Sequence, residues 1–148
     1  MYILDTNTLI YFFKGIGNIS TRLLHTPPRS VGIPTIVFFE LEVGIAKSSS
    51  PKKRRLQLES LTATINILPL GHEEVKCAAA IRADLENRGK PIGPYHVLIA
   101  GTALANNGVL VTQNTSGAPE GPVIAKQGRD AEIKKPGNKL AIRHCSWP

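Results

Sequence analysis

Hydrophobic and polar positions alternate along the chain in blocks that predict short strands followed by helices. Apolar runs at residues 1–4, 30–33, 65–70 and 109–111 are short and end at polar or turn-forming residues, as strands do. Between these runs, apolar residues recur at three- and four-residue intervals, which is typical of helices that bury one face. The order of elements predicts an α/β fold of three layers, with a central, mostly parallel sheet flanked by helices.

The first two helices are predicted from apolar spacing and from the residues that bound them. The first should end near Gly15, and its candidate core residues are Leu9, Ile10, Phe12 and Phe13. The second begins at Pro34 with Thr35 as its N-cap, and it places apolar side chains and one carboxylate on one face. These are Ile36, Phe39, Glu40 and Val43.

Three further helices are predicted between residue 52 and about residue 108. One runs through the basic residues 52–55 to about residue 64. Another covers residues 72–88, ends at Gly89 and carries an apolar face made of Val75, Ala78, Ile81 and Leu85. The last opens after Gly93-Pro94, holds a histidine, His96, in its first turn and ends near residues 106–108. From about residue 116 the pattern stops, so we expect a domain at 1–115 and an irregular or poorly ordered tail at 116–148.

The overall composition is that of an ordinary globular chain with a basic surplus. The hydrophobic fraction is 42%, the charged fraction 20% and the net charge +7. The surplus suits a polyanionic partner, although the run at 52–55 reads more simply as a solvated helix face. No apolar run reaches the roughly 20 residues that span a bilayer. The N-terminus does not look like a secretory signal, and we expect a cytoplasmic protein.

Three polar side chains are predicted to meet at one edge of the sheet. Asp5 and Asn114 follow predicted strands, and Glu40 stands among apolar residues of the helix after the second strand. Because carboxylate and amide oxygens suit hard cations, they form a candidate site for Mg²⁺ or Mn²⁺. Each has a simpler alternative: Asp5 as a helix N-cap, Glu40 as a solvated helix residue, Asn114 as a turn residue. Nucleotide-cofactor binding is disfavoured, because no glycine-rich turn follows the first strand.

The segments that hold these residues also carry a family resemblance. They read YILDTNTLIYFFKG, PTIVFFELEVGIAKS and IRADLENRGKPIGPYHVLIAGTALANNGVLVTQNT. Together they resemble a PIN domain, specifically a VapC-type toxin of a bacterial toxin–antitoxin pair, over roughly residues 1–115. The resemblance implies a metal-dependent endoribonuclease acting on structured RNA such as tRNA. It also implies a homodimer that a VapB-type antitoxin inhibits by lying along the active-site groove.

The resemblance assigns roles residue by residue. Asp5 and Glu40 match the first two acidic residues of the family, and Asn114 matches its fourth position. Thr6 and Asn7 complete the D-T-N motif, and Thr112 matches a nearby hydroxyl residue. The third acid belongs in the pattern P-I-G-P-x-D, where this chain has His96.

A histidine at the third acidic position removes one negative charge and offers nitrogen in place of oxygen. Mg²⁺ binding should suffer most, because Mg²⁺ prefers oxygen and Mn²⁺ accepts imidazole better. We therefore expect an impaired nuclease, with a loss on the order of 10²-fold or more in rate. The alternatives are a ligand adapted to Mn²⁺, a general base, or a plain helix residue if the alignment is shifted. A catalytically inactive module that binds antitoxin or RNA is the competing function.

The tail is the second departure from the family pattern. Residues 116–122 can be encoded so that a shift of one base reads Arg-Glu-Leu-Arg-Lys-Val, close to the family's continuation after the N-T pair. We therefore consider a frameshift origin for the tail. Loss of the family's final strand would expose the edge beside the fourth strand, unless the alternating stretch at 139–147 supplies a substitute.

Overall fold

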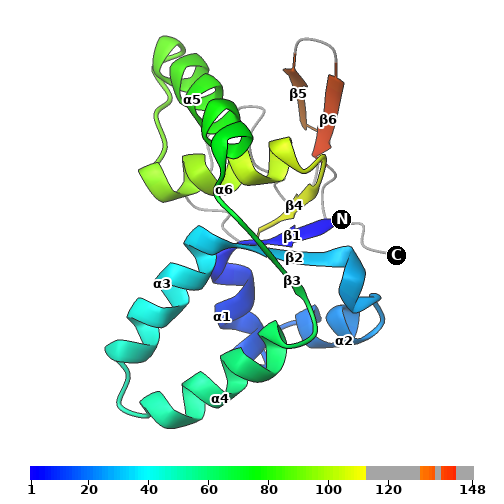
Figure 1. Cartoon of the computed structure of the whole chain (residues 1–148), viewed down its shortest axis with the longest axis vertical. Helices are drawn as coiled ribbons and strands as arrows, with labels where there is room; N and C mark the ends of the chain where they lie inside the picture. Colours follow the sequence, from blue (N-terminus) through cyan, green and yellow to red (C-terminus); the bar gives the residue numbers. More distant parts are fainter. Residues whose placement is uncertain (113–130, 136–137, 143–148) are drawn as a thin grey trace.

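Four parallel strands form the central sheet of the protein. The computed structural model describes residues 1–112, 131–135 and 138–142. Strands β1 (Tyr2–Leu4), β2 (Val31–Pro34), β3 (Asn66–Leu68) and β4 (Val109–Val111) lie in the order β3-β2-β1-β4 (Figure 1). Every pairing is parallel, and Tyr2 lies opposite Val31 on one side and Val109 on the other. The four predicted strands are confirmed.

Helices cover both faces of this sheet. In Figure 1, α5 (His72–Asn87) and α6 (Pro94–Ala105) lie on one side. On the other side lie α1 (Thr6–Lys14), α2 (Ile19–Leu24), α3 (Thr35–Ala46) and α4 (Pro51–Thr62). The three-layer α/β fold is confirmed, whereas α2 and the short 3₁₀ turn at Pro28–Ser30 were not predicted. Within the described ranges, no helix combines the length and apolar character that crossing a membrane requires.

The main core lies between the sheet and the helices on either face. Its fully buried members include Ile3, Leu4, Leu9, Val31 and Ile33. A second apolar cluster joins α5 to α6. It consists of Cys77, Ile81, Leu85, Ala100 and Leu104.

The two helices of this second cluster approach each other closely at a glycine. A Cβ added to Gly101 would lie 2.5 Å from Cβ of Ala78 and 2.6 Å from its backbone nitrogen. A glycine is therefore required at this crossing, because two of the three nearest atoms belong to the backbone of the other helix and the third is the Cβ attached to it.

Three local predictions are wrong. Thr35 does not cap α3: Pro34 holds the N-cap position, and the Thr35 hydroxyl donates to the Leu68 carbonyl at 2.8 Å, tying α3 to β3. Phe39 is 47% exposed, because α3 buries the face made of Val37, Leu41 and Ile45 instead. Val75 is also 47% exposed, although Ala78, Ile81 and Leu85 are buried as expected.

The C-terminal segment contains two strands. β5 (Ala131–Lys135) and β6 (Asn138–Ile142) form a separate antiparallel pair, so neither strand joins the central sheet. β6 overlaps the alternating stretch that was considered as a substitute strand. The remaining residues of the tail, and the stretch in which a frameshift was considered, lie outside the described residues.

Candidate functional site

The predicted site lies where the order of strands in the sheet reverses direction. Chain order runs from β1 outward through β2 to β3, whereas β4 lies on the other side of β1. Asp5 follows β1 directly, and Thr112 follows β4. Glu40 lies on α3, which continues from β2. In parallel sheets the carboxyl ends of strands at such a reversal form the usual ligand-binding crevice.

Asp5 is a buried carboxylate whose two oxygens have different partners. Only 4% of the residue is exposed. Its Oδ1 accepts a hydrogen bond from the backbone N–H of Thr8 at 2.7 Å, which makes Asp5 the N-cap of α1. Its Oδ2 accepts a short hydrogen bond from the Thr112 hydroxyl. The N-cap alternative for Asp5 is thus correct, but capping occupies one oxygen and leaves the other facing the end of β4.

Thr8 joins the first turn of α1 to the end of β4, a role that sequence reasoning missed. Its side chain is fully buried, and its hydroxyl donates to the carbonyl of Val111 at 3.1 Å. The backbone N–H of Asp5 also donates to Val111, at 3.2 Å. A single helix turn is therefore bonded to the end of β4 at several points. A hydroxyl three residues after an N-cap aspartate was the available signal.

Glu40 is the second carboxylate, and a hydroxyl next to Asp5 holds it. The residue is half-buried, and its Oε2 accepts a short hydrogen bond from the Thr6 hydroxyl. Because Thr6 directly follows Asp5, this bond brings the two acidic residues to one corner. Glu40 is therefore not an ordinary solvated helix residue. Glu42 is nearer to that description, because it forms an ion pair of 2.9 Å with Arg55 at the surface.

His96 lies in the first turn of α6 and is exposed. Its ring lies back over the start of the helix, with Nδ1 only 3.3 Å from the position of a Cβ added to Gly93. Within the part of the chain that the structure describes, no hydrogen bond or ion pair links His96 to Asp5 or Glu40. The structure therefore joins the first two acidic positions by hydrogen bonds and leaves the third outside that network.

The other predicted residues have different outcomes. Asn7 is half-buried in the first turn of α1. Thr112 is bonded to Asp5 as described, whereas Asn114 lies outside the described residues. Among residues 1–112, 131–135 and 138–142, no three His, Cys, Asp or Glu side chains gather closely enough to hold a metal ion by themselves. The corner thus offers two carboxylates and the hydroxyls of Thr6 and Thr112, an all-oxygen set.

The sequence matches a known family model and curated proteins over most of its length. The PIN domain family model matches residues 2–116. The tRNA(fMet)-specific endonuclease VapC of Salmonella typhimurium is 30% identical over 113 residues, which cover 76% of this chain and 86% of the relative. The protein of the same name from Shigella flexneri is 28% identical over 114 residues, 77% of this chain and 86% of the relative.

Solved structures give the same result. DNA-bound VapBC from Salmonella typhimurium matches with a TM-score of 0.73 and 32% identity, over 78% of this chain and 88% of that one. VapBC2 from Rickettsia felis, bound to a DNA fragment from its promoter, matches with a TM-score of 0.72 and 29% identity over the same shares. The chain belongs to the PIN domain family and is a VapC-like member of it.

Proposed function

We propose that this chain is a VapC-type toxin: a metal-dependent endoribonuclease that cleaves structured RNA and is neutralised by a VapB-type antitoxin. The observation that carries the proposal is the pairing of Asp5 and Glu40 at the sheet reversal, each held by a threonine hydroxyl. Relatives named as tRNA-specific endonucleases support tRNA as the substrate class. Structures of VapBC complexes support the antitoxin as the partner.

The donor set at this corner fits Mg²⁺ or Mn²⁺. Mg²⁺ is commonly bound through one or two carboxylates and keeps several of its waters, so Asp5 and Glu40 would be its protein ligands here. Such a cation, when bound, would polarise the scissile phosphate and activate water. The chain's own contribution is orientation: the Thr112 and Thr6 hydroxyls fix Asp5 Oδ2 and Glu40 Oε2, and the N-cap bond fixes Asp5 Oδ1.

The histidine at position 96 supports the proposal that the nuclease activity is reduced. With a histidine at the third acidic position, the site has one carboxylate fewer to bind the cation and to place the attacking water. The exposed ring over Gly93 and the lack of a three-residue ligand group in the described region favour, as a second candidate function, a module that binds RNA or antitoxin without cleaving. The two functions differ in one measurable property, which is metal-dependent cleavage.

Cleavage of tRNA by the purified chain in Mg²⁺ and in Mn²⁺ tests the proposal, with His96→Asp and Asp5→Ala compared in parallel. Weak cleavage by the wild type, at least about 10²-fold stronger in His96→Asp and absent in Asp5→Ala, is the expected result. Rescue by His96→Asp would also establish that the rest of the site is intact. Binding of RNA or antitoxin with no cleavage by any of the three proteins would replace the nuclease with the binding module.

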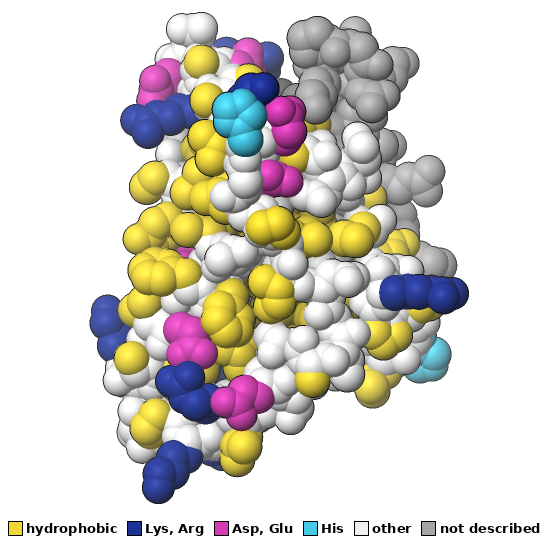
Figure 2. Space-filling model, in the orientation of Figure 1, with side chains coloured by type: hydrophobic (Ala, Val, Ile, Leu, Met, Phe, Trp, Pro, Cys, Tyr) yellow, Lys and Arg dark blue, Asp and Glu magenta, His cyan; other side chains and the backbone are white. Residues whose placement is uncertain are grey.

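We further propose a homodimer in the cytoplasm, as the family resemblance implies. Figure 2 shows hydrophobic side chains gathered over the start of α6 and the adjoining part of α3, on the left of the view. Phe39 and Tyr95 are 47% and 42% exposed, and their rings meet edge to face with centroids 5.9 Å apart. An exposed aromatic pair of this kind suits an interface between subunits. Light scattering tests it: a monomeric wild type would contradict the proposal, and Phe39→Ser should shift a dimer towards monomer.

A further inference from the structure

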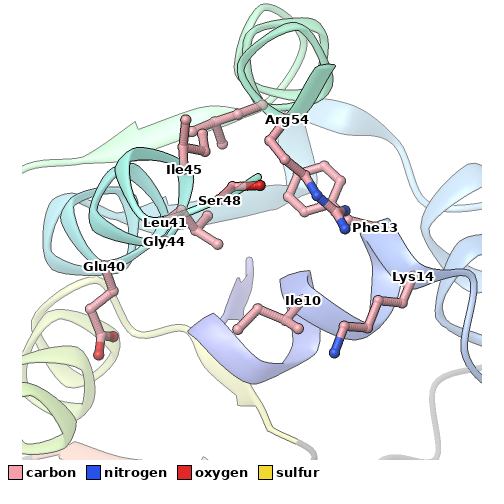
Figure 3. A pocket seen from close by; sticks show the side chains of 10 residues that line it. Ile10, Phe13, Lys14, Glu40, Leu41, Gly44, Ile45, Ser48 and Arg54 are labelled. Carbon is pink, nitrogen blue, oxygen red and sulfur yellow. The ribbon is translucent and has the colours of Figure 1, made fainter. Parts of the chain in front are cut away.

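A pocket of about 280 Å³ lies beside Glu40, between α1, α3 and α4 (Figure 3). Its floor is apolar and comes from all three helices: Ile10, Phe13, Leu41, Ile45 and Leu58. Pockets for drug-sized ligands usually measure about 300–1,000 Å³, so this one suits a single small ring system. Because Glu40 belongs both to the pocket wall and to the carboxylate pair, a ligand in the pocket would lie next to the candidate site.

The charged side chains of the pocket are separated from one another. In Figure 3, Lys14 on α1 and Arg54 on α4 lie on one side of the pocket, and Glu40 on α3 lies on the other. Within the described part of the chain, neither cation forms an ion pair with a carboxylate. Arg54 donates only a long hydrogen bond of 3.5 Å to Gln57, whereas its neighbour Arg55 pairs with Glu42 at 2.9 Å. Two cations are thus available to an anionic ligand.

A glycine in the last turn of α3 leaves space in the pocket. Gly44 lines the pocket, has an ordinary helical backbone, and a Cβ added to it would meet no atom within 4 Å. Glycine inside a helix is unfavourable compared with alanine, and neither backbone conformation nor packing requires it here. The missing side chain therefore has its effect on the space in the pocket and not on the fold.

We propose that this pocket holds the nucleotide next to the scissile phosphate of the RNA. Its base would lie on the apolar floor, and its outer phosphate would be bound by Lys14 and Arg54. The assignment rests on the proposed function, since Glu40 defines the position of the scissile phosphate. Charge favours RNA as the occupant, because a nucleotide offers an apolar ring and an anion side by side. An unpaired nucleotide of a loop meets this requirement, because its base is free to leave the stack.

The test measures binding, not cleavage, of a fluorescein-labelled RNA stem–loop in EDTA, using the full chain. Lys14→Gln with Arg54→Gln should weaken binding about tenfold or more. The slope of log K against log salt should fall by about 0.7, which corresponds to the loss of one single-strand phosphate contact. Lys52→Gln with Lys53→Gln is the matched control, because both lysines are exposed on α4, lie outside the pocket and carry the same charge. The control should change affinity and slope clearly less.

A second pair of variants tests the floor without changing charge. Gly44→Met should fill the pocket and weaken binding about tenfold, whereas Gly44→Ala, which fills less of the pocket, should weaken binding less and raise the melting temperature. Equal losses in the pocket and control charge variants would overturn the proposal. The proposal would also be overturned if the pocket variants bound RNA normally but no longer bound a VapB-type antitoxin peptide. That result would assign the pocket to the antitoxin. Absence of RNA binding by the wild type would also overturn it, whereas binding without cleavage would refute only the nuclease function.

Discussion

Asp5 has a structural role and a proposed chemical role, and two substitutions separate them. Asp5→Ala removes the N-cap bond to Thr8, worth about 1 kcal/mol. It also removes the hydrogen bond from Thr112 to a charged oxygen, worth about 1.5 kcal/mol. The total of about 2–3 kcal/mol should lower the melting temperature by roughly 5–10 °C for a chain of this size. Asn caps helices as well as Asp does, and its amide can donate to the Thr112 hydroxyl. Asp5→Asn should therefore cost under about 1 kcal/mol.

The same two substitutions should affect the proposed chemical role of Asp5 equally. Both substitutions remove the carboxylate, so both should reduce metal-dependent cleavage at least about 10²-fold in the His96→Asp background, where activity is measurable. Thermal unfolding in EDTA and cleavage in Mn²⁺ measure the two roles independently. If Asp5→Asn unfolds as easily as Asp5→Ala, the assignment of Oδ1 as the capping atom is wrong. If Asp5→Asn cleaves as well as its parent, Asp5 does not act through its charge.

Three stability predictions follow from individual contacts, each checked by urea unfolding. Gly101→Ala should cost about 1–3 kcal/mol, because the new Cβ meets the backbone of Ala78 on the facing helix. An unchanged midpoint would mean that α5 and α6 separate freely there. Gly89→Ala should cost about 1 kcal/mol, because Gly89 has a φ of 66°. Arg55→Gln should change stability by less than about 1 kcal/mol despite its bond to Glu42, because the pair is exposed to solvent.

The fold was predictable where periodicity had one interpretation. The four short apolar runs ended at polar residues and became the four parallel strands. Helix faces were less certain. α3 is apolar on nearly all sides, so spacing could not select the face with Val37 and Leu41 over the one with Phe39. Successive residues of a helix are rotated by about 100° about its axis. In α5 the face that buries Ala78, Ile81 and Leu85 therefore includes the half-buried Glu74, and Val75 lies to one side of it and is exposed.

The candidate site was predictable in its acids and not in their partners. Asp5 and Glu40 follow from their places after β1 and β2, since parallel strands end at one edge. The hydroxyls that hold them come from Thr112 and Thr6, which lie 107 and 34 residues away in the chain. Which strand ends meet depends on the order β3-β2-β1-β4, and local pattern does not encode that order. The pocket cations could not be predicted for the same reason: Lys14 and Arg54 line one pocket only when α1 and α4 both pack against α3.

The position of β4 beside β1 also bears on protein synthesis. β1 leaves the ribosome before the other strands of the central sheet, yet one of its two neighbours, β4, is made only after a further hundred or so residues. Asp5 therefore lacks its Thr112 partner, and the end of β1 lacks the strand that anchors it, until residue 112 has emerged. Nascent and prematurely terminated chains would expose an unpaired β1 edge and an incomplete acidic corner. For a toxin, this arrangement delays completion of the site until synthesis of the domain is nearly finished.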